Sequence, residues 1–399
     1  MPVAPEPVTR GVLSRWPAPW RLAALLAGVL PVSGALRGQP PYRHRYCSAP
    51  FLIGLLTGLL IINQNGTWLA PGAIRLYGIS SLALAVLFKL VINVPTMASV
   101  LLLVAHGSRL PGLLDRTDRL MVSSETADGG RASRLLLAAL MAARGALAVW
   151  DLLSADDVLA PTLNQLPQLW SSIMSPVITW RTQTLLALDI HLLTQLSAAF
   201  DSISEGLERL LAPQPQQPPP DRQLAPVEVT SLHTAAVGEQ PKGKPTPPSS
   251  SVSESLSALR ERYIQAADAT AAVSAMYALP TLCELLHFVT LLISALVVQV
   301  TPSPPALVYR CVWTTALVAL LSHHGQRLQE AASRPARLLL RAAPAADAAT
   351  EAQVGRLVAL VRELQPAFSA GGVGSINGRL LVSVSAGFVT YLVVLLQMT

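Results

Sequence analysis

The sequence predicts an all-α membrane protein with seven spanning helices, its N-terminus in the cytoplasm and its C-terminus outside the cell. Of its 399 residues, 51% are hydrophobic and only 13% are charged, whereas soluble domains have about 25% charged residues. Apolar runs of about 20 residues, the length that crosses a bilayer, recur along the chain. Basic residues alternate between successive loops, which orients the predicted spans.

The seven apolar runs differ in what surrounds them. The first is short, and the second contains Lys89 and Pro95. The fourth and the sixth continue into polar sequence with helical spacing, so we expect both helices to project beyond the membrane. In order, the predicted spans are 48–63, 77–105, 134–153, 166–199, 277–300, 305–321 and 380–398.

Another apolar stretch, 22–32, precedes these spans. It is short and is broken by Pro31, so we expect an amphipathic helix that lies on the membrane surface. The arginines ahead of it also fit a cleaved signal peptide, which would invert the topology.

The charges of the loops place the N-terminus inside. The N-terminal tail is rich in arginine, whereas the loop after the first span has only Arg75. The next loop has four arginines, whereas the one after the third span has Asp156 and Asp157 and no base. Because excess Lys and Arg marks the cytoplasmic side, the sequon at Asn65 falls in an outer loop, and Asn65 is a candidate glycosylation site.

Composition divides the chain into five segments. The stretch 213–252 is rich in Pro, Gln, Ser and Thr and has few large apolar residues, so we expect a disordered cytoplasmic linker. The other segments are a cytoplasmic N-terminal segment at 1–47, four spans at 48–212, two spans with cytoplasmic extensions at 253–350, and the last span within 351–399.

The sequence indicates no enzyme, and we expect no catalytic residues, no metal and no cofactor. The three cysteines form no CxxC pair, so neither a zinc site nor a disulfide framework is indicated. The net charge of +6 comes mostly from arginines in loops beside apolar runs. That pattern is typical of membrane topology, and we expect no nucleic-acid partner.

Ionisable side chains inside a span are costly unless they are paired or face a cavity. Packing ion pairs, such as Lys89 with Glu284 and Arg144 with Asp189, are the first interpretation, and ligand contacts are the second. The residues concerned are Lys89, Arg144, Asp151, Arg181, Asp189, Glu284, His287 and Arg310.

Aromatic residues gather in the outer parts of the third, fourth and sixth spans. They predict the rim of an outward-facing ligand pocket, and an interfacial aromatic belt explains them equally well. The pocket candidates are Trp150, Asp151, Trp170, Trp180, Tyr309 and Trp313.

One face of the last span is small or weakly polar. Ser383, Gly387, Thr390, Val394 and Gln397 follow a 4-3-4-3 spacing and therefore share one side of a helix. Such a stripe lines a water-filled pore if several copies surround an axis, or it packs tightly against another helix. The spacing leaves both interpretations open.

The C-terminal stretch resembles the arthropod gustatory receptor family, whose members end in Thr-Tyr, five apolar residues and Gln-Phe. Here Thr390 and Tyr391 are followed by LVVLL, Gln397 and Met398, so Met398 is the departure from the motif. The preceding FSA, IN and LL, within 368–381, also fall where the family has Phe-Thr-Ala, Leu-Asp/Asn and Leu-Leu.

The resemblance implies a taste receptor of the plasma membrane, related to insect odorant receptors, that acts as a ligand-gated non-selective cation channel. It implies a homo- or hetero-tetramer with other gustatory receptors, whose last segment is split. Residues 351–368 would form a cytoplasmic anchor helix, and 380–398 would line the pore. A small-molecule tastant would favour the open state.

Two other classes of function remain as alternatives. A secondary transporter should show a repeat or paired broken helices, and the sequence shows one break. A metabotropic seven-helix receptor requires its N-terminus outside, which the arginine distribution opposes.

Overall fold

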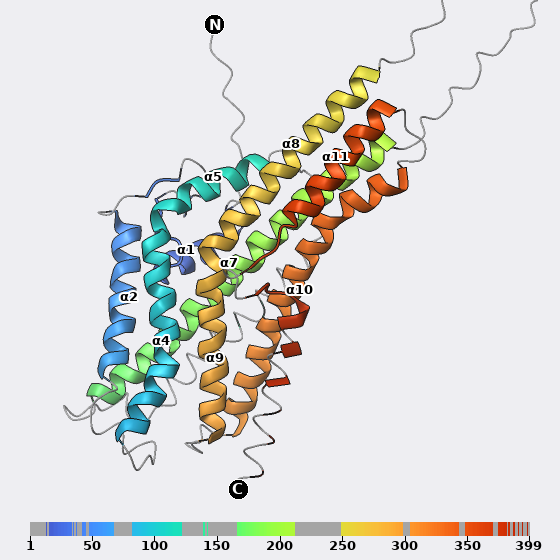
Figure 1. Cartoon of the computed structure of the whole chain (residues 1–399). Coiled ribbons are helices and arrows are strands. Elements are labelled where there is room, and N and C mark those ends of the chain that lie inside the picture. Colours follow the sequence, from blue (N-terminus) through green and yellow to red (C-terminus); the bar gives the residue numbers. More distant parts are fainter. Residues whose placement is uncertain are drawn as a thin grey trace, which may run out of the picture.

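The computed structural model is built of long helices (Figure 1). Among the residues that it describes there is no β-strand, and the extended pairings are the isolated bridges Ser33–Arg43 and Ser369–Ser375. The described residues are 13, 16–33, 35, 37, 42–44, 48–67, 82–121, 139, 142, 166–211, 249–297, 304–342, 348–369, 374–380, 382, 383, 386, 387, 390, 393 and 397.

The N-terminal part consists of two upright helices and two short ones near their upper ends, of which one packs against the first upright helix and the other runs from the top of the second towards α8 (Ser249–Val273) (Figure 1). The upright helices are α2 (Ala49–Thr67) and α4 (Leu82–His106). The short ones are α1 (Ala18–Leu26) and α5 (Leu110–Met121), and the 3₁₀ turn η2 (Gly107–Arg109) joins α4 to α5. Pro19 stands in the first turn of α1, where its fixed φ and missing N–H favour a helix start.

The longest helices exceed the thickness of a bilayer. Helix α7 (Leu166–Leu211) has 46 residues, which at 1.5 Å per residue corresponds to about 69 Å, against a hydrocarbon core of about 30 Å. Helix α10 (Pro304–Ala342) has 39 residues. Helices α8 (Ser249–Val273) and α9 (Leu279–Val297) continue one another through the π-helical turn η6 (Ser274–Ala278).

These helices form a second bundle beyond the level of α2 and α4. Helix α8, helix α11 (Ala348–Leu364) and the C-terminal halves of α7 and α10 run side by side there (Figure 1). We call this group the projecting bundle. The extensions of the fourth and sixth spans, predicted from their helical spacing, are part of it.

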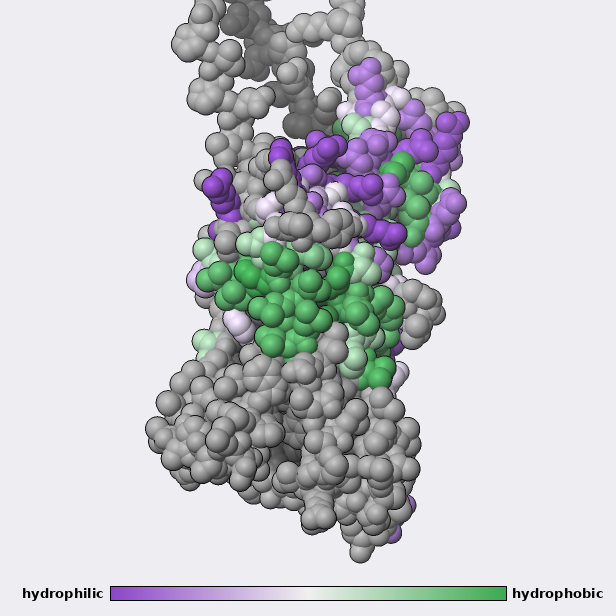
Figure 2. Space-filling model, turned by 90° about the vertical axis from the view of Figure 1, so that its left-hand side faces the viewer, coloured by the Kyte–Doolittle hydropathy of each residue, from purple (hydrophilic) through white to green (hydrophobic). Residues whose placement is uncertain are grey.

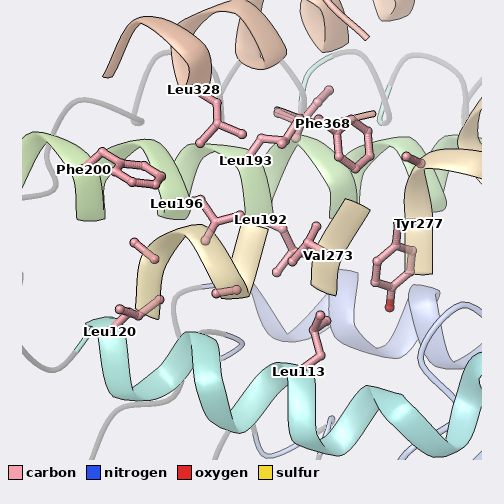
Figure 3. Packing of buried hydrophobic residues seen from close by; sticks show 14 of the residues in the cluster. Leu113, Leu120, Leu192, Leu193, Leu196, Phe200, Val273, Tyr277, Leu328 and Phe368 are labelled. Atoms are coloured by element: carbon pink, nitrogen blue, oxygen red, sulfur yellow. The ribbon is translucent and has the colours of Figure 1, made fainter. Parts of the chain in front are cut away.

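The core lies where the projecting bundle meets the rest of the molecule (Figure 3). The Phe200 ring packs edge-on against Tyr263, with ring centroids 5.3 Å apart. Burying one such large apolar side chain contributes about 1.5–3 kcal/mol. The residues labelled in this core are Leu113, Leu120, Leu192, Leu193, Leu196, Phe200, Val273, Tyr277, Leu328 and Phe368.

Large apolar side chains are exposed at the level of the upright helices. Figure 2 shows a hydrophobic band on one face, with hydrophilic residues above it. On α2 the exposed residues are Leu52, Leu55, Leu56 and Leu59. Within the described side chains, two stretches, Val94–Leu120 and Ser253–His287, are long and apolar enough to cross a membrane. The band is the surface expected against lipid tails.

The prediction for the N-terminal apolar stretch is wrong in its second half. Helix α1 ends at Leu26, and residues 27–32 form a turn that packs into the protein, with Leu30 fully buried. The turn is possible because Gly28 has a φ of +70°, which suits glycine. A Cβ on Gly28 would lie 2.9 Å from the Cα of Gly54, so the two backbones approach closely.

Two helix boundaries also differ from the prediction. Helix α2 continues to Thr67, so Asn65 lies in its last turn and not in a loop. Helix α8 is already present at Ser249, inside the predicted linker, whereas residues 77–81, the predicted start of the second span, lie outside the described residues. The third span lies outside the described residues except Ala139 and Ala142, which are helical, and so does the linker at 213–248.

Candidate functional site

A buried ion pair joins three helices. Arg181 of α7 donates to Glu284 of α9, and both side chains are at most 3% exposed. Thr182 donates to the second Glu284 oxygen at 2.7 Å, and Arg181 Nη2 lies 3.2 Å from Ser99 Oγ on α4. Among the described side chains the charged partner of Glu284 is Arg181, which was also among the candidates, and the side chain of the suggested partner Lys89 lies outside the description. Breaking such a pair costs more than its net contribution, because one charge is left buried.

A second polar contact lies nearer the projecting bundle. Thr281 of α9 donates to Asp189 Oδ2 of α7, and both residues are fully buried. The other Asp189 oxygen and the Tyr277 hydroxyl are buried without a hydrogen-bond partner among the described residues. The partner predicted for Asp189, Arg144, lies outside the described residues. Tyr277 belongs to η6, and π-turns of this kind are frequent at functional sites.

The C-terminal helix begins at Gly378, after a break from α11. Ser383, Gly387, Thr390 and Gln397 of the predicted stripe are all exposed, and Val394 lies outside the described residues. A Cβ on Gly387 would meet no atom within 4 Å. The Thr390 hydroxyl donates to Ala386 O of its own helix at 2.9 Å. The small, polar face therefore has no partner among the described residues of the chain.

We call the segment 365–377, between α11 and the C-terminal helix, the joint. Its described ends pair with each other, since Ile376 N donates to Phe368 O at 2.8 Å. The Phe368 side chain is fully buried and points into the core in Figure 3. Asn377 Oδ1 accepts from Arg379 N at 3.0 Å, so Asn377 caps the new helix at its N-terminus.

Two neighbouring helices hold the joint. Ser274, the first residue of η6, donates to Ser369 O at 2.6 Å and accepts from Ser369 N at 2.8 Å. On α10, Gly325 lies against the joint so closely that a Cβ there would be 2.0 Å from Ile376 O. The described ends of the joint are therefore packed, with Ser369 held by η6 on one side and Ile376 against α10 on the other.

Two cavities open beside the joint. One, of about 850 Å³, lies between α10 and the start of the C-terminal helix and is mostly polar, with Gln326, Glu330 and Arg379 in its lining. The other, of about 510 Å³, lies between α8, α10 and α11, beneath the joint. The described part of the chain contains no group of three or more His, Cys, Asp or Glu side chains suited to a metal ion.

Of the six residues predicted to line the ligand pocket, only Trp180 has a described side chain. Trp150 and Asp151 lie outside the described residues. Trp170, Tyr309 and Trp313 lie on α7 and α10, and their side chains are outside the description. Trp180 is 38% exposed on α7. The ligand pocket stays a prediction.

Sequence reasoning missed Ser274 and Gly325. Ser274 looks like an ordinary small residue of a helical run, and its contact lies 95 residues away along the chain. Gly325 carried a usable signal, because a glycine in a helix interior costs about 1 kcal/mol relative to alanine and often marks a close approach.

The sequence matches the family of 7tm chemosensory receptors over residues 19–399. The chain belongs to this family, and the expectation drawn from its C-terminal motif is confirmed at that level. A search among curated proteins finds no match.

Two solved structures share the fold over nearly the whole chain. Both are of the olfactory receptor OR5 from the insect Machilis hrabei, one alone and one in complex with eugenol. Their TM-scores are 0.64 and 0.62, with 12% sequence identity over 97% of this chain and 99% of the receptor. The predicted seven-transmembrane helical fold is confirmed.

Proposed function

We propose that the chain is a gustatory receptor that works as a ligand-gated, non-selective cation channel in the plasma membrane of chemosensory neurons. The observation that carries the proposal is the unpartnered face of the C-terminal helix, with Ser383, Gly387, Thr390 and Gln397 exposed. In a bilayer, polar groups face a partner or water rather than lipid. In a ring of such helices around a central axis, these polar groups would face both neighbouring helices and a water-filled channel.

The proposed assembly is a tetramer, either of this chain or with other gustatory receptors. Ser383, Gly387, Thr390, Val394 and Gln397 would line the pore. The side chains are small or uncharged, which suits a pore that passes several cations without strong selection. The polar 850 Å³ cavity beside Ser383 would form part of the inner mouth of this pore.

Gating would pass through the joint. The continuous helix α8–η6–α9 reaches from the outer end at Val297 to the projecting bundle, and Ser274 within it binds Ser369 of the joint. A tastant in the outer half of the subunit that moved α9 would therefore move the base of the pore helix. The ligand must bind the open state more tightly than the closed one to do so.

The taste role rests on the C-terminal motif of Thr390, Tyr391, Gln397 and Met398. The similar solved structures are those of an olfactory receptor, one of which contains eugenol. A ligand panel must therefore include volatile phenols such as eugenol as well as sugars, bitter compounds and amino acids.

The test is two-electrode voltage clamp of cells that express the full chain, alone and with partner receptors. We expect ligand-evoked cation current whose reversal potential or block changes in Thr390→Leu and Gln397→Ala. Leu56→Ala, which changes an exposed apolar residue of α2, is the matched control and should leave both unchanged. Equal properties in all four proteins would remove the C-terminal helix from the pore.

Orientation needs a separate test. Loop charges predict a cytoplasmic N-terminus and an outer C-terminus. An N-terminal tag should become accessible to antibody after permeabilisation, and a C-terminal tag should be accessible on intact cells. The reverse result would contradict the predicted topology.

A further inference from the structure

Helix α5 has a basic face that no part of the described chain covers. Arg109, the last residue of η2, and Arg116 and Arg119 of α5 are all exposed, and Arg116 and Arg119, three residues apart, share one side of the helix. The opposite side, with Leu114 and Asp118 buried, and the adjoining Leu113 are turned into the protein, where α5 packs against α7 and α8. Among the described residues, none of the three arginines forms an ion pair.

The acidic residues of α5 do not neutralise this face. Asp118 is 7% exposed and lies on the buried side of the helix. Burial of the Tyr42 phenol raises the pKa of Tyr42, and the nearby Asp118 carboxylate raises it further. Asp115 is half-buried, with one carboxylate oxygen inside the protein. The outward charge of α5 is therefore positive.

The structure places α5 at the border of the apolar band. A Cβ on Gly107, where α4 ends, would lie 3.2 Å from His44, and the His44 ring packs edge-on against Phe51 in the first turn of α2. The exposed leucines of α2 begin at the next residue, Leu52. Figure 1 shows α5 running from the upper end of α4 towards α8, and Figure 2 shows hydrophilic residues above the band.

Helix α1 adds apolar contact at the same border. Leu22 and Leu26 are 46% and 40% exposed, and Leu26 O accepts a hydrogen bond from Thr57 of α2 at 2.9 Å. A bilayer that covered the apolar band would place the exposed leucines against its lipid tails and the arginines of η2 and α5 near its headgroups. Apolar and basic surfaces side by side are the combination that binds an anionic leaflet.

We propose that Arg109, Arg116 and Arg119 form a binding site for the phosphate groups of anionic phospholipids. Guanidinium groups bind phosphate oxygens through paired, charge-assisted hydrogen bonds. The predicted topology puts this border in the cytoplasmic leaflet, which is the negatively charged one. Because α5 packs against α8, and α8 holds the joint through η6, lipid bound here would bias the position of the joint.

The test measures lipid binding directly, so it does not depend on channel activity. The purified full chain in neutral detergent micelles is titrated with dioctanoyl phosphatidylserine, with dioctanoyl phosphatidylcholine and with phosphoserine. The test variant is Arg109→Gln/Arg116→Gln/Arg119→Gln. The matched control is Arg209→Gln/Arg260→Gln/Arg341→Gln, which removes three exposed arginines from the projecting bundle.

We expect phosphatidylserine to bind at least tenfold more tightly than phosphatidylcholine. The test variant should lose most of that preference, since each arginine contributes about fivefold at an anionic surface, and the control should change by less than twofold. Gel filtration and the unfolding temperature establish that each variant is folded.

Three results would overturn the proposal. One is unchanged binding by a folded test variant, and another is an equal loss in both triple variants, which would mean attraction by net charge alone. The third is phosphoserine binding as tightly as the lipid, which would make the face a site for soluble anions. If the test variant does not fold, the single variants Arg116→Gln and Arg119→Gln are measured, and each should weaken binding severalfold.

Discussion

Gly325→Ala tests whether α10 fixes the base of the C-terminal helix. The new Cβ would lie 2.0 Å from Ile376 O and 3.1 Å from Ile376 C, so α10 and the joint must separate by at least 1.0 Å to reach the 3.0 Å that real Cβ contacts respect. The obstacle is backbone, so no side-chain rotation relieves it. Gly378, two residues beyond Ile376, is the first residue of the last helix.

Overpacking of this kind costs about 1–3 kcal/mol in the free energy of unfolding. Any alanine in a helix interior also gains up to about 1 kcal/mol over glycine. Gly355→Ala is the matched control, because Gly355 lies in α11 and a Cβ there meets nothing within 4 Å. Since both variants share the gain in helix propensity, their difference isolates the contact with the joint.

The assays are thermal unfolding of the purified chain and voltage clamp at matched surface expression. We expect Gly325→Ala to unfold at a lower temperature than Gly355→Ala, and to change basal current or ligand sensitivity, which Gly355→Ala should leave unchanged. If the two variants unfold together and gate alike, then Gly325 does not hold the joint, and the proposed role of the contact between α10 and Ile376 is refuted.

Three further predictions concern stability, each measured by thermal unfolding. Glu284→Gln should cost about 3–5 kcal/mol because Arg181 is left charged and buried, and Arg181→Met/Glu284→Leu should cost less; a single variant as stable as the wild type would contradict the ion pair. Gly28→Ala should lose about 1–2 kcal/mol from its φ of +70° and more from Gly54, whereas Gly112→Ala, in open space, should not be destabilised. Burial, with smaller effects of His323 and Arg327, lowers the pKa of His324 to about 4; its unfolded pKa is about 6.5, so stability should fall as pH falls from about 6.5 to 4. His324→Gln should flatten that decline, whereas the exposed neighbour variant His323→Gln should keep most of it.

The sequence predicted the helices well and their contacts poorly. Apolar runs and the polar extensions of α7 and α10 follow from local spacing, because a helix makes its own hydrogen bonds and needs only length and composition to cross a bilayer. The ion pair of Glu284 joins residues 103 positions apart. The partner of Glu284 depends on how α7 and α9 pack against each other, and the spacing of residues along one sequence gives no information on that packing.

The same limit applies to the candidate site. The stripe from Ser383 to Gln397 could be predicted because one helix defines it. The joint could not, because Ser274, Gly325 and Ile376 come from three elements and none is chemically distinctive. Gly28 and Gly54 were missed for a related reason, since a contact between two backbones leaves no side-chain signal beyond the glycines themselves.

The length of α7 has a mechanical consequence. It crosses the apolar level and continues into the projecting bundle without a break, as one helix of 46 residues. A rod of about 69 Å that tilts by about 2° moves its far end by roughly 2.4 Å. This displacement corresponds to a tilt about the outer end, so a small rotation of α7 there would move the side chains packed in the projecting bundle the most.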